Sequence, residues 1–233
     1  MKKAIIFDMD GVIFDSERLY IECCKEAAEE LGMDGIVETC YRCIGVTTDT
    51  TRRVLLEVYR DPALVDRFRE KTVALYLEKY ESGLLNMKPG VKELLQYLKA
   101  HGFKTAIASS TRTEIVRKEL AKAGVLEYFD RIVGGDQVSR SKPAPDIFLK
   151  AAAALETPPD RCIVIEDSFN GIRAAKAAGM TAIMVPDLLQ PDEEMKSLAD
   201  RIEASLPRVL ELLSANALSE NGTDQERRLA AEG

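Results

Sequence analysis

Apolar runs and helical periodicities divide this chain into two parts. Residues 3–7 form an apolar run that ends at Asp8-Met9-Asp10-Gly11, which predicts a buried strand followed by a turn. From residue 15 to about residue 83 the pattern is helical. Ser16 is the expected N-cap of the first helix, and Gly32 ends its apolar periodicity. Two further helical stretches complete this part, which contains no obvious strand candidate.

A strand–helix alternation begins at Pro89-Gly90. The expected strands cover residues 105–108, 131–133, 162–165 and 182–185, and the expected helices cover residues 91–100, 113–123, 146–155 and 171–178. This alternation predicts right-handed βαβ units and a parallel sheet, which the strand at residues 3–7 should join. The helical block between them is then an insertion over the carboxyl edge of the sheet.

We therefore expect an α/β fold with two domains. Its core would comprise residues 1–14 and 84–213, with a last helix near residues 207–213, and residues 15–83 would form an all-helical cap. Residues 214–233 are polar and lack large apolar side chains, which predicts a disordered tail.

Composition narrows the classes of partner. A formal net charge of -7 and a pI near 5.0 argue against nucleic acid or an anionic membrane as a primary partner. No apolar run approaches the roughly 20 residues of a membrane helix. The start of the chain lacks the apolar segment of a secretory signal. We therefore expect a cytoplasmic protein, with its five cysteines as reduced thiols.

Polar residues follow the predicted strands at the edge where parallel α/β sheets bind ligands. They are Asp8 and Asp10 after the first strand, Ser109, Ser110 and Thr111 after the second, Lys142 in the loop before a helix, and Glu166 and Asp167 after the fourth. Each alone has an ordinary structural explanation, such as a turn, a helix cap or a solvated surface charge. Together they predict a phosphoryl-transfer site.

Each residue type has a role in that chemistry. The Asp8 carboxylate can attack phosphorus and form an aspartyl-phosphate, and Asp10 can act as general acid and then general base. Asp8, Asp167 and the backbone carbonyl of Asp10 suit Mg2+, a hard cation that prefers oxygen ligands. Ser109, the backbone N–H groups around Ser110 and the ammonium of Lys142 can hold the phosphoryl oxygens.

These motifs resemble those of the haloacid dehalogenase superfamily, in particular its β-phosphoglucomutase-like phosphatase branch. The matching segments are Phe7-Asp8-Met9-Asp10-Gly11-Val12, Ala106-Ile107-Ala108-Ser109-Ser110, Ser141-Lys142-Pro143-Ala144-Pro145-Asp146 and Ile165-Glu166-Asp167-Ser168-Phe169-Asn170-Gly171. The resemblance covers about residues 3–213. It implies a Rossmann-like core, an inserted helical cap, dependence on Mg2+ and the roles given above, and it adds Glu166 at the edge of the metal site.

The cap should decide whether water or a sugar hydroxyl accepts the phosphoryl group. Its loop Ile44-Gly45-Val46-Thr47-Thr48 resembles the substrate loop of the mutase, and Lys71 loosely matches a mutase lysine. Mutases, however, carry a lysine at Ile44, an arginine at Thr48 and usually a histidine at Tyr20. We therefore expect Tyr20, Gly45, Thr47, Thr48 and Lys71 to contact substrate, and we favour a phosphatase for a small phosphorylated metabolite, in particular a sugar phosphate.

Several alternatives stay open from the sequence. β-Phosphoglucomutase is the second hypothesis, and a non-catalytic sensor of phosphorylated metabolites is the third. Cys23-Cys24 and Cys40-x-x-Cys43 suggest zinc, but buried thiols are the simpler interpretation. The only histidine, His101, ends a helix, which leaves no pair of histidines for catalysis. We expect a monomer.

Overall fold

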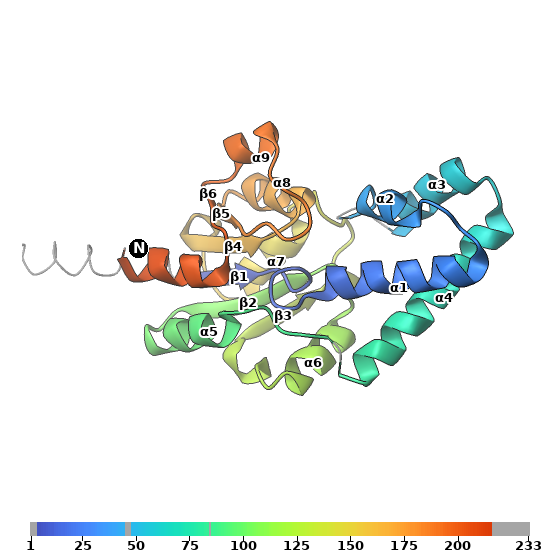
Figure 1. The fold of residues 1–233 in the computed structure, drawn as a ribbon. Coiled ribbons are helices and arrows are strands. Elements are labelled where there is room, and N and C mark those ends of the chain that lie inside the picture. The colour runs from blue at the N-terminus through green and yellow to red at the C-terminus, as the bar shows by residue number, and fades with distance from the viewer. Residues whose placement is uncertain (1–3, 45–47, 84, 216–233) are drawn as a thin grey trace, which may run out of the picture.

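The computed structural model describes residues 4–44, 48–83 and 85–215, apart from the side chains of residues 48–50. Their core is a six-stranded parallel sheet with the order β3-β2-β1-β4-β5-β6 (Figure 1), which confirms the predicted α/β fold. The strands are β1 (Ala4–Phe7), β2 (Lys104–Ser109), β3 (Arg131–Gly134), β4 (Cys162–Glu166), β5 (Thr181–Met184) and β6 (Arg201–Ile202). β1 lies between β2 and β4, so the residues that follow it leave the middle of the sheet.

Helices cover both faces of this sheet. They are α5 (Val91–Ala100), α6 (Thr113–Lys122), α7 (Asp146–Ala154), α8 (Phe169–Ala177), α9 (Glu193–Leu198), the 3-10 turns Leu126–Tyr128, Gly135–Gln137 and Pro159–Arg161, and a final helix over residues 206–215. Alternate residues of β1 point to opposite faces. Ile5 and Phe7 pack in the cluster with α5, α6 and the final helix, whereas Ile6 packs in the cluster with α7 and α8. The sheet is therefore buried on both sides, as a parallel sheet requires.

The cap is inserted between β1 and β2. It consists of α1 (Ser16–Leu31), α2 (Ile36–Tyr41), α3 (Thr48–Tyr59) and α4 (Pro62–Glu81). Cys24, Val65 and Phe68 belong to a hydrophobic cluster of its own, separate from the two clusters of the sheet. The cap extends away from one end of the sheet (Figure 1), as an insertion after β1 requires.

The two connections between cap and core lie side by side. Phe14 forms an antiparallel bridge with Met87, and the backbone N–H of Asp15 donates to the carbonyl of Asn86 at 2.9 Å. The side chain of Lys88 then bonds to Asp187 in the loop after β5, with Nζ 2.5 Å from Oδ1. The chain thus leaves and re-enters the core at a single place.

Some local predictions differ from the structure. Ser16 is not the N-cap of α1, because Asp15 holds that position and Ser16 is the first helical residue. The short elements α2, α9 and β6 were not expected, and the final helix extends beyond residue 213. Within the described ranges, no helix is both long and apolar enough to cross a membrane.

Candidate active site

Three acidic side chains meet at the carboxyl ends of β1 and β4. Asp8 directly follows β1, where its backbone N–H donates to the carbonyl of Ile165 at 2.9 Å. Glu166 ends β4 and Asp167 follows it, and carboxylate oxygens of Asp8, Glu166 and Asp167 all lie within 4.8 Å of one another. All three residues are buried. Parallel pairing of β1 with β4 is what brings these residues, so distant in the sequence, to one place.

Lys142 reaches this cluster from the loop before α7. Its Nζ lies 2.5 Å from Oδ1 of Asp8 and 2.6 Å from Oε1 of Glu166, and its side chain is 8% exposed. The other oxygen of Glu166 accepts from the N–H of Ser168 at 2.7 Å and from its hydroxyl at 2.9 Å. Glu166 is therefore fixed on both sides, which keeps it in position beside Asp8.

Two glycines let the backbone approach these carboxylates. A Cβ at Gly11 would lie 2.2 Å from Oδ2 of Asp167, and the φ of Gly11 is +74°. A Cβ at Gly171 would lie 1.8 Å from Oε1 of Glu166. Any larger side chain at either position would displace the neighbouring carboxylate, so the close approach of the backbone requires both glycines. The positive φ of Gly11 is a second reason for glycine at that position.

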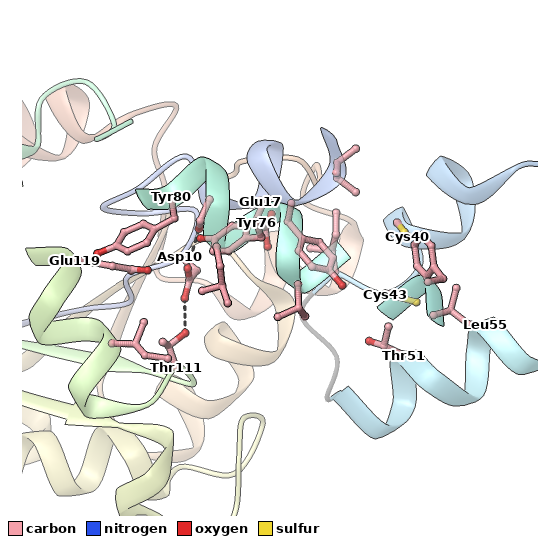
Figure 2. A pocket seen from close by; sticks show the side chains of 18 of the residues that line it. Asp10, Glu17, Cys40, Cys43, Thr51, Leu55, Tyr76, Tyr80, Thr111 and Glu119 are labelled. Carbon is pink, nitrogen blue, oxygen red and sulfur yellow. Dashed lines mark hydrogen bonds between the residues drawn. The ribbon is translucent and has the colours of Figure 1, made fainter. Parts of the chain in front are cut away.

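Asp10 is held by hydroxyl groups from two different elements. The Ser16 hydroxyl donates to its Oδ1 at 2.8 Å, and the Thr111 hydroxyl donates to its Oδ2 at 3.0 Å (Figure 2). Ser109 lies next to them, with its hydroxyl 3.4 Å from Asp10, whereas Ser110 is exposed. The sequence places Thr111 at this edge of the sheet without indicating its specific role, and it gives no signal that Ser16 contacts Asp10.

The electrostatics of the cluster favour a further cation. Burial raises the pKa of Asp8 to about 7; Lys142 opposes this rise, and the negative charges of Glu166 and Asp10 add to it. Burial likewise raises the pKa of Asp167 well above its usual range, and Glu166 adds to this. Burial opposes the charge of Lys142, but Asp8 and Glu166 raise its pKa overall. Buried carboxylates thus outnumber the ammonium, and their hard oxygen donors fit a divalent cation.

A cavity of about 450 Å³ opens from Asp10 between the cap and the core (Figure 2). Tyr20 and Ile44 of the cap line this cavity, and Glu119 of α6 lines it on the side of the core. Lys71 does not line it, because its ammonium pairs with Glu30 on the cap. Of the other expected substrate contacts, Gly45 and Thr47 lie outside the described residues, and so does the side chain of Thr48.

The cysteines are free thiols, and Cys23, Cys24, Cys40 and Cys162 are buried. Among the described residues, the groups of acidic, histidine and cysteine side chains that could share a metal contain no cysteine. The interpretation as buried thiols therefore fits four of the five cysteines, whereas Cys43 is partly exposed.

Comparison with known proteins finds a family and relatives that this sequence resembles. The family model for haloacid dehalogenase-like hydrolases matches residues 5–185. A phosphorylated carbohydrates phosphatase from Thermotoga maritima is 36% identical over 181 residues, which are 78% of this chain and 83% of the relative.

Solved structures show the same architecture. A β-phosphoglucomutase from Clostridium difficile is 26% identical with a TM-score of 0.71, covering 88% of this chain and 92% of the other. CbbY from Rhodobacter sphaeroides, solved in complex with xylulose-(1,5)bisphosphate, is 28% identical with a TM-score of 0.67, covering 88% of this chain and 95% of the other.

Proposed function

This chain belongs to the haloacid dehalogenase-like hydrolase family, and we propose on that basis that it hydrolyses a small phosphorylated metabolite, in particular a sugar phosphate, with Mg2+ as cofactor. The observation that carries the proposal is the buried contact of Asp8 with Lys142 beside Glu166 and Asp167. The phosphorylated-carbohydrate phosphatase from Thermotoga maritima and the sugar bisphosphate bound to CbbY support the substrate class.

Asp8 acts as the nucleophile. One of its carboxylate oxygens forms a bond to phosphorus while the bond from phosphorus to the leaving alcohol oxygen breaks, which produces an aspartyl-phosphate. Asp10 donates the proton that the leaving oxygen needs. It then takes a proton from the water that attacks the aspartyl-phosphate, which releases inorganic phosphate and restores Asp8. The hydroxyls of Ser16 and Thr111 keep the Asp10 carboxyl oriented for both transfers.

The remaining residues hold the phosphoryl group and the cation. Asp8, Glu166, Asp167 and the backbone carbonyl of Asp10 would bind Mg2+, which offsets the repulsion between the nucleophile and a phosphate dianion. An ammonium has three N–H groups, and Lys142 uses two of them on Asp8 and Glu166, so the third can bind a phosphoryl oxygen. Ser109 and the backbone around Ser110 provide further donors.

Water is favoured over a sugar hydroxyl as the acceptor. A mutase must bind the second phosphate of a bisphosphorylated intermediate, yet Ile44 lines the cavity where mutases carry a lysine. Arg52 could have supplied a substitute charge, but its guanidinium makes two bonds to Asp66, at 2.8 and 2.9 Å. β-Phosphoglucomutase remains the second candidate because of the likeness to the Clostridium difficile enzyme.

The test is phosphate release from a panel of phosphorylated metabolites with and without Mg2+. We expect turnover that needs Mg2+ and is abolished by Asp8→Asn, while Asp34→Asn, a change at an exposed aspartate of the cap, has no effect. Retained activity in Asp8→Asn would contradict the mechanism, and no release from any compound would favour the sensor hypothesis. Isomerisation of a sugar phosphate in an assay primed with a bisphosphate would favour the mutase.

A further inference from the structure

The cavity beside Asp10 has an apolar character that phosphoryl transfer itself does not require. Asp10 and Thr111 lie at its inner end, and its walls continue outward between α4 and α6. Tyr20 and Tyr76 meet in that wall with ring centroids 6.4 Å apart and planes inclined at 62° (Figure 2 labels Tyr76). Because the cavity opens from Asp10, the alcohol portion of a phosphate ester bound at this site would extend into it.

Large apolar side chains are exposed in this region to an unusual degree. Seven large hydrophobic residues are exposed in the described part of the chain, and four of them line this cavity: Tyr20, Val73, Leu77 and Ile115. Val73 and Leu77 belong to the cap, whereas Ile115 belongs to the core. Apolar surface gathered in one place and left in water indicates a surface that is covered during function.

The charges of the lining exclude an acidic occupant. Lys118 is the one lysine or arginine among the described lining residues, and its side chain is 64% exposed and directed toward Glu81, 3.9 Å away. Three carboxyl groups, those of Asp10, Glu17 and Glu119, line the same cavity. A second phosphate or a carboxylate would find no cation directed toward it here, and most of the lining is apolar, so these surroundings favour an uncharged group beyond the phosphoryl group.

We infer that the phosphorylated alcohol carries an uncharged, planar ring that packs against Tyr20, Tyr76 and Ile115 while its phosphoryl group lies at Asp8. This inference rests on the proposed phosphatase function and refines its substrate class to a sugar phosphate with a ring substituent. Aromatic rings stack favourably against tyrosine, and a planar ring covers more apolar surface than a hydrated polyol does. Closure of the cap without a ring could cover the same side chains, and the experiment must separate the two.

A matched pair of substrates makes that separation. Ribose 5-phosphate and uridine 5′-monophosphate carry the same phosphorylated sugar, and only the second has a planar ring. We expect kcat/KM to be about tenfold or more higher for the uridine compound, within the range that a contact in an apolar pocket provides. Ile115→Ala should reduce this ratio severalfold. Leu149→Ala is the control, because Leu149 is 40% exposed against 42% for Ile115 but lies outside the cavity.

Each outcome decides between the explanations. Equal kcat/KM for the two compounds would overturn the inference, as would an Ile115→Ala variant that lowers both values by the same factor, which is the result expected from cap closure alone. Acetyl phosphate, a small reactive compound without a ring, tests the chemistry separately. If the protein hydrolyses acetyl phosphate but not uridine 5′-monophosphate, only the inference is overturned. If it releases phosphate from none of the three compounds, the proposed function is overturned.

Discussion

The ammonium of Lys142 lies 2.5 Å from the carboxylate of Asp8, although the two residues are 134 positions apart in the sequence. The same ammonium contacts Glu166, which makes it the cation shared by two buried carboxylates at the ends of neighbouring strands. Removing it would therefore affect both the chemistry and the stability of the site.

Lys142→Met should lower phosphate release about 100-fold or more, since it removes a donor to the transferring phosphoryl group. At pH 8 without metal it should also lower the free energy of unfolding by about 3 kcal/mol, because two buried carboxylates lose their cation. Steady-state kinetics and urea unfolding measure the two effects. Lys92→Met, at an exposed lysine of α5, should change neither, and a fully active Lys142→Met variant would contradict this assignment.

Gly11→Ala should weaken metal binding by displacing Asp167. Its Cβ would overlap Oδ2 of Asp167, so we expect the Mg2+ concentration for half-maximal activity to rise about tenfold or more, the effect of disturbing a metal ligand. Gly32→Ala is the matched control, because Gly32 has a φ of +67° but nothing within 4 Å of the added Cβ. Both variants incur backbone strain, and only Gly11→Ala should alter the Mg2+ titration. A similar shift in both would attribute the effect to strain.

Lys88→Met should destabilise the connection between cap and core. The Asp187 side chain is 2% exposed, and after loss of Lys88 its remaining cation is Arg18, 3.6 Å away and 57% exposed, so the variant should lose about 2 kcal/mol in the free energy of unfolding. Lys196→Met removes an ion pair in which both side chains are more than half exposed, and it should change the stability little. Thermal unfolding of the two variants compares the costs, and equal melting temperatures would show that Asp187 does not depend on Lys88.

Glu119→Gln should alter the pH dependence of stability. Burial, with the nearby charge of Asp10, raises the pKa of Glu119 to about 7. The folded protein then binds more protons than the unfolded chain between pH 4.5 and 7, so stability falls as pH rises through this window. The variant lacks this loss, so its melting temperature should exceed that of the wild type at pH 8 but not at pH 4. The difference should be about 2–4 °C for each kcal/mol of stability that the wild type loses. Glu127→Gln, at an exposed glutamate, should show no such pH-dependent difference.

Much of the core could be predicted because its signals are local. β1 is an uninterrupted apolar run, and β4 is apolar up to its last residue, Glu166. Parallel strands place the residues that follow them at one edge, so the meeting of Asp8 with Asp167 follows from topology. The six-residue helix α2 is too short to show a reliable periodicity, and the two residues of β6 are too few to form an apolar run.

Side-chain partners were harder to predict than elements. The sequence offers no indication that the Ser16 hydroxyl points to Asp10, because a serine at the start of a helix is usually explained as its cap. The close approach of Gly11 to Asp167 likewise depends on how two loops pack. Lys71 matched a mutase residue by position, yet a contact with Glu30 on the neighbouring helix determines where its ammonium lies.

The side-by-side connections at Phe14 and Met87 have a consequence for how such a protein can diversify. An insert whose two ends meet can be exchanged, enlarged or lost while the strand that precedes Asp8 keeps its pairing, as insertion into a domain at adjacent points allows. Mutations in the segment of the gene that encodes the cap can therefore change which compound is accepted, while the segments that encode the proposed catalytic residues stay unchanged.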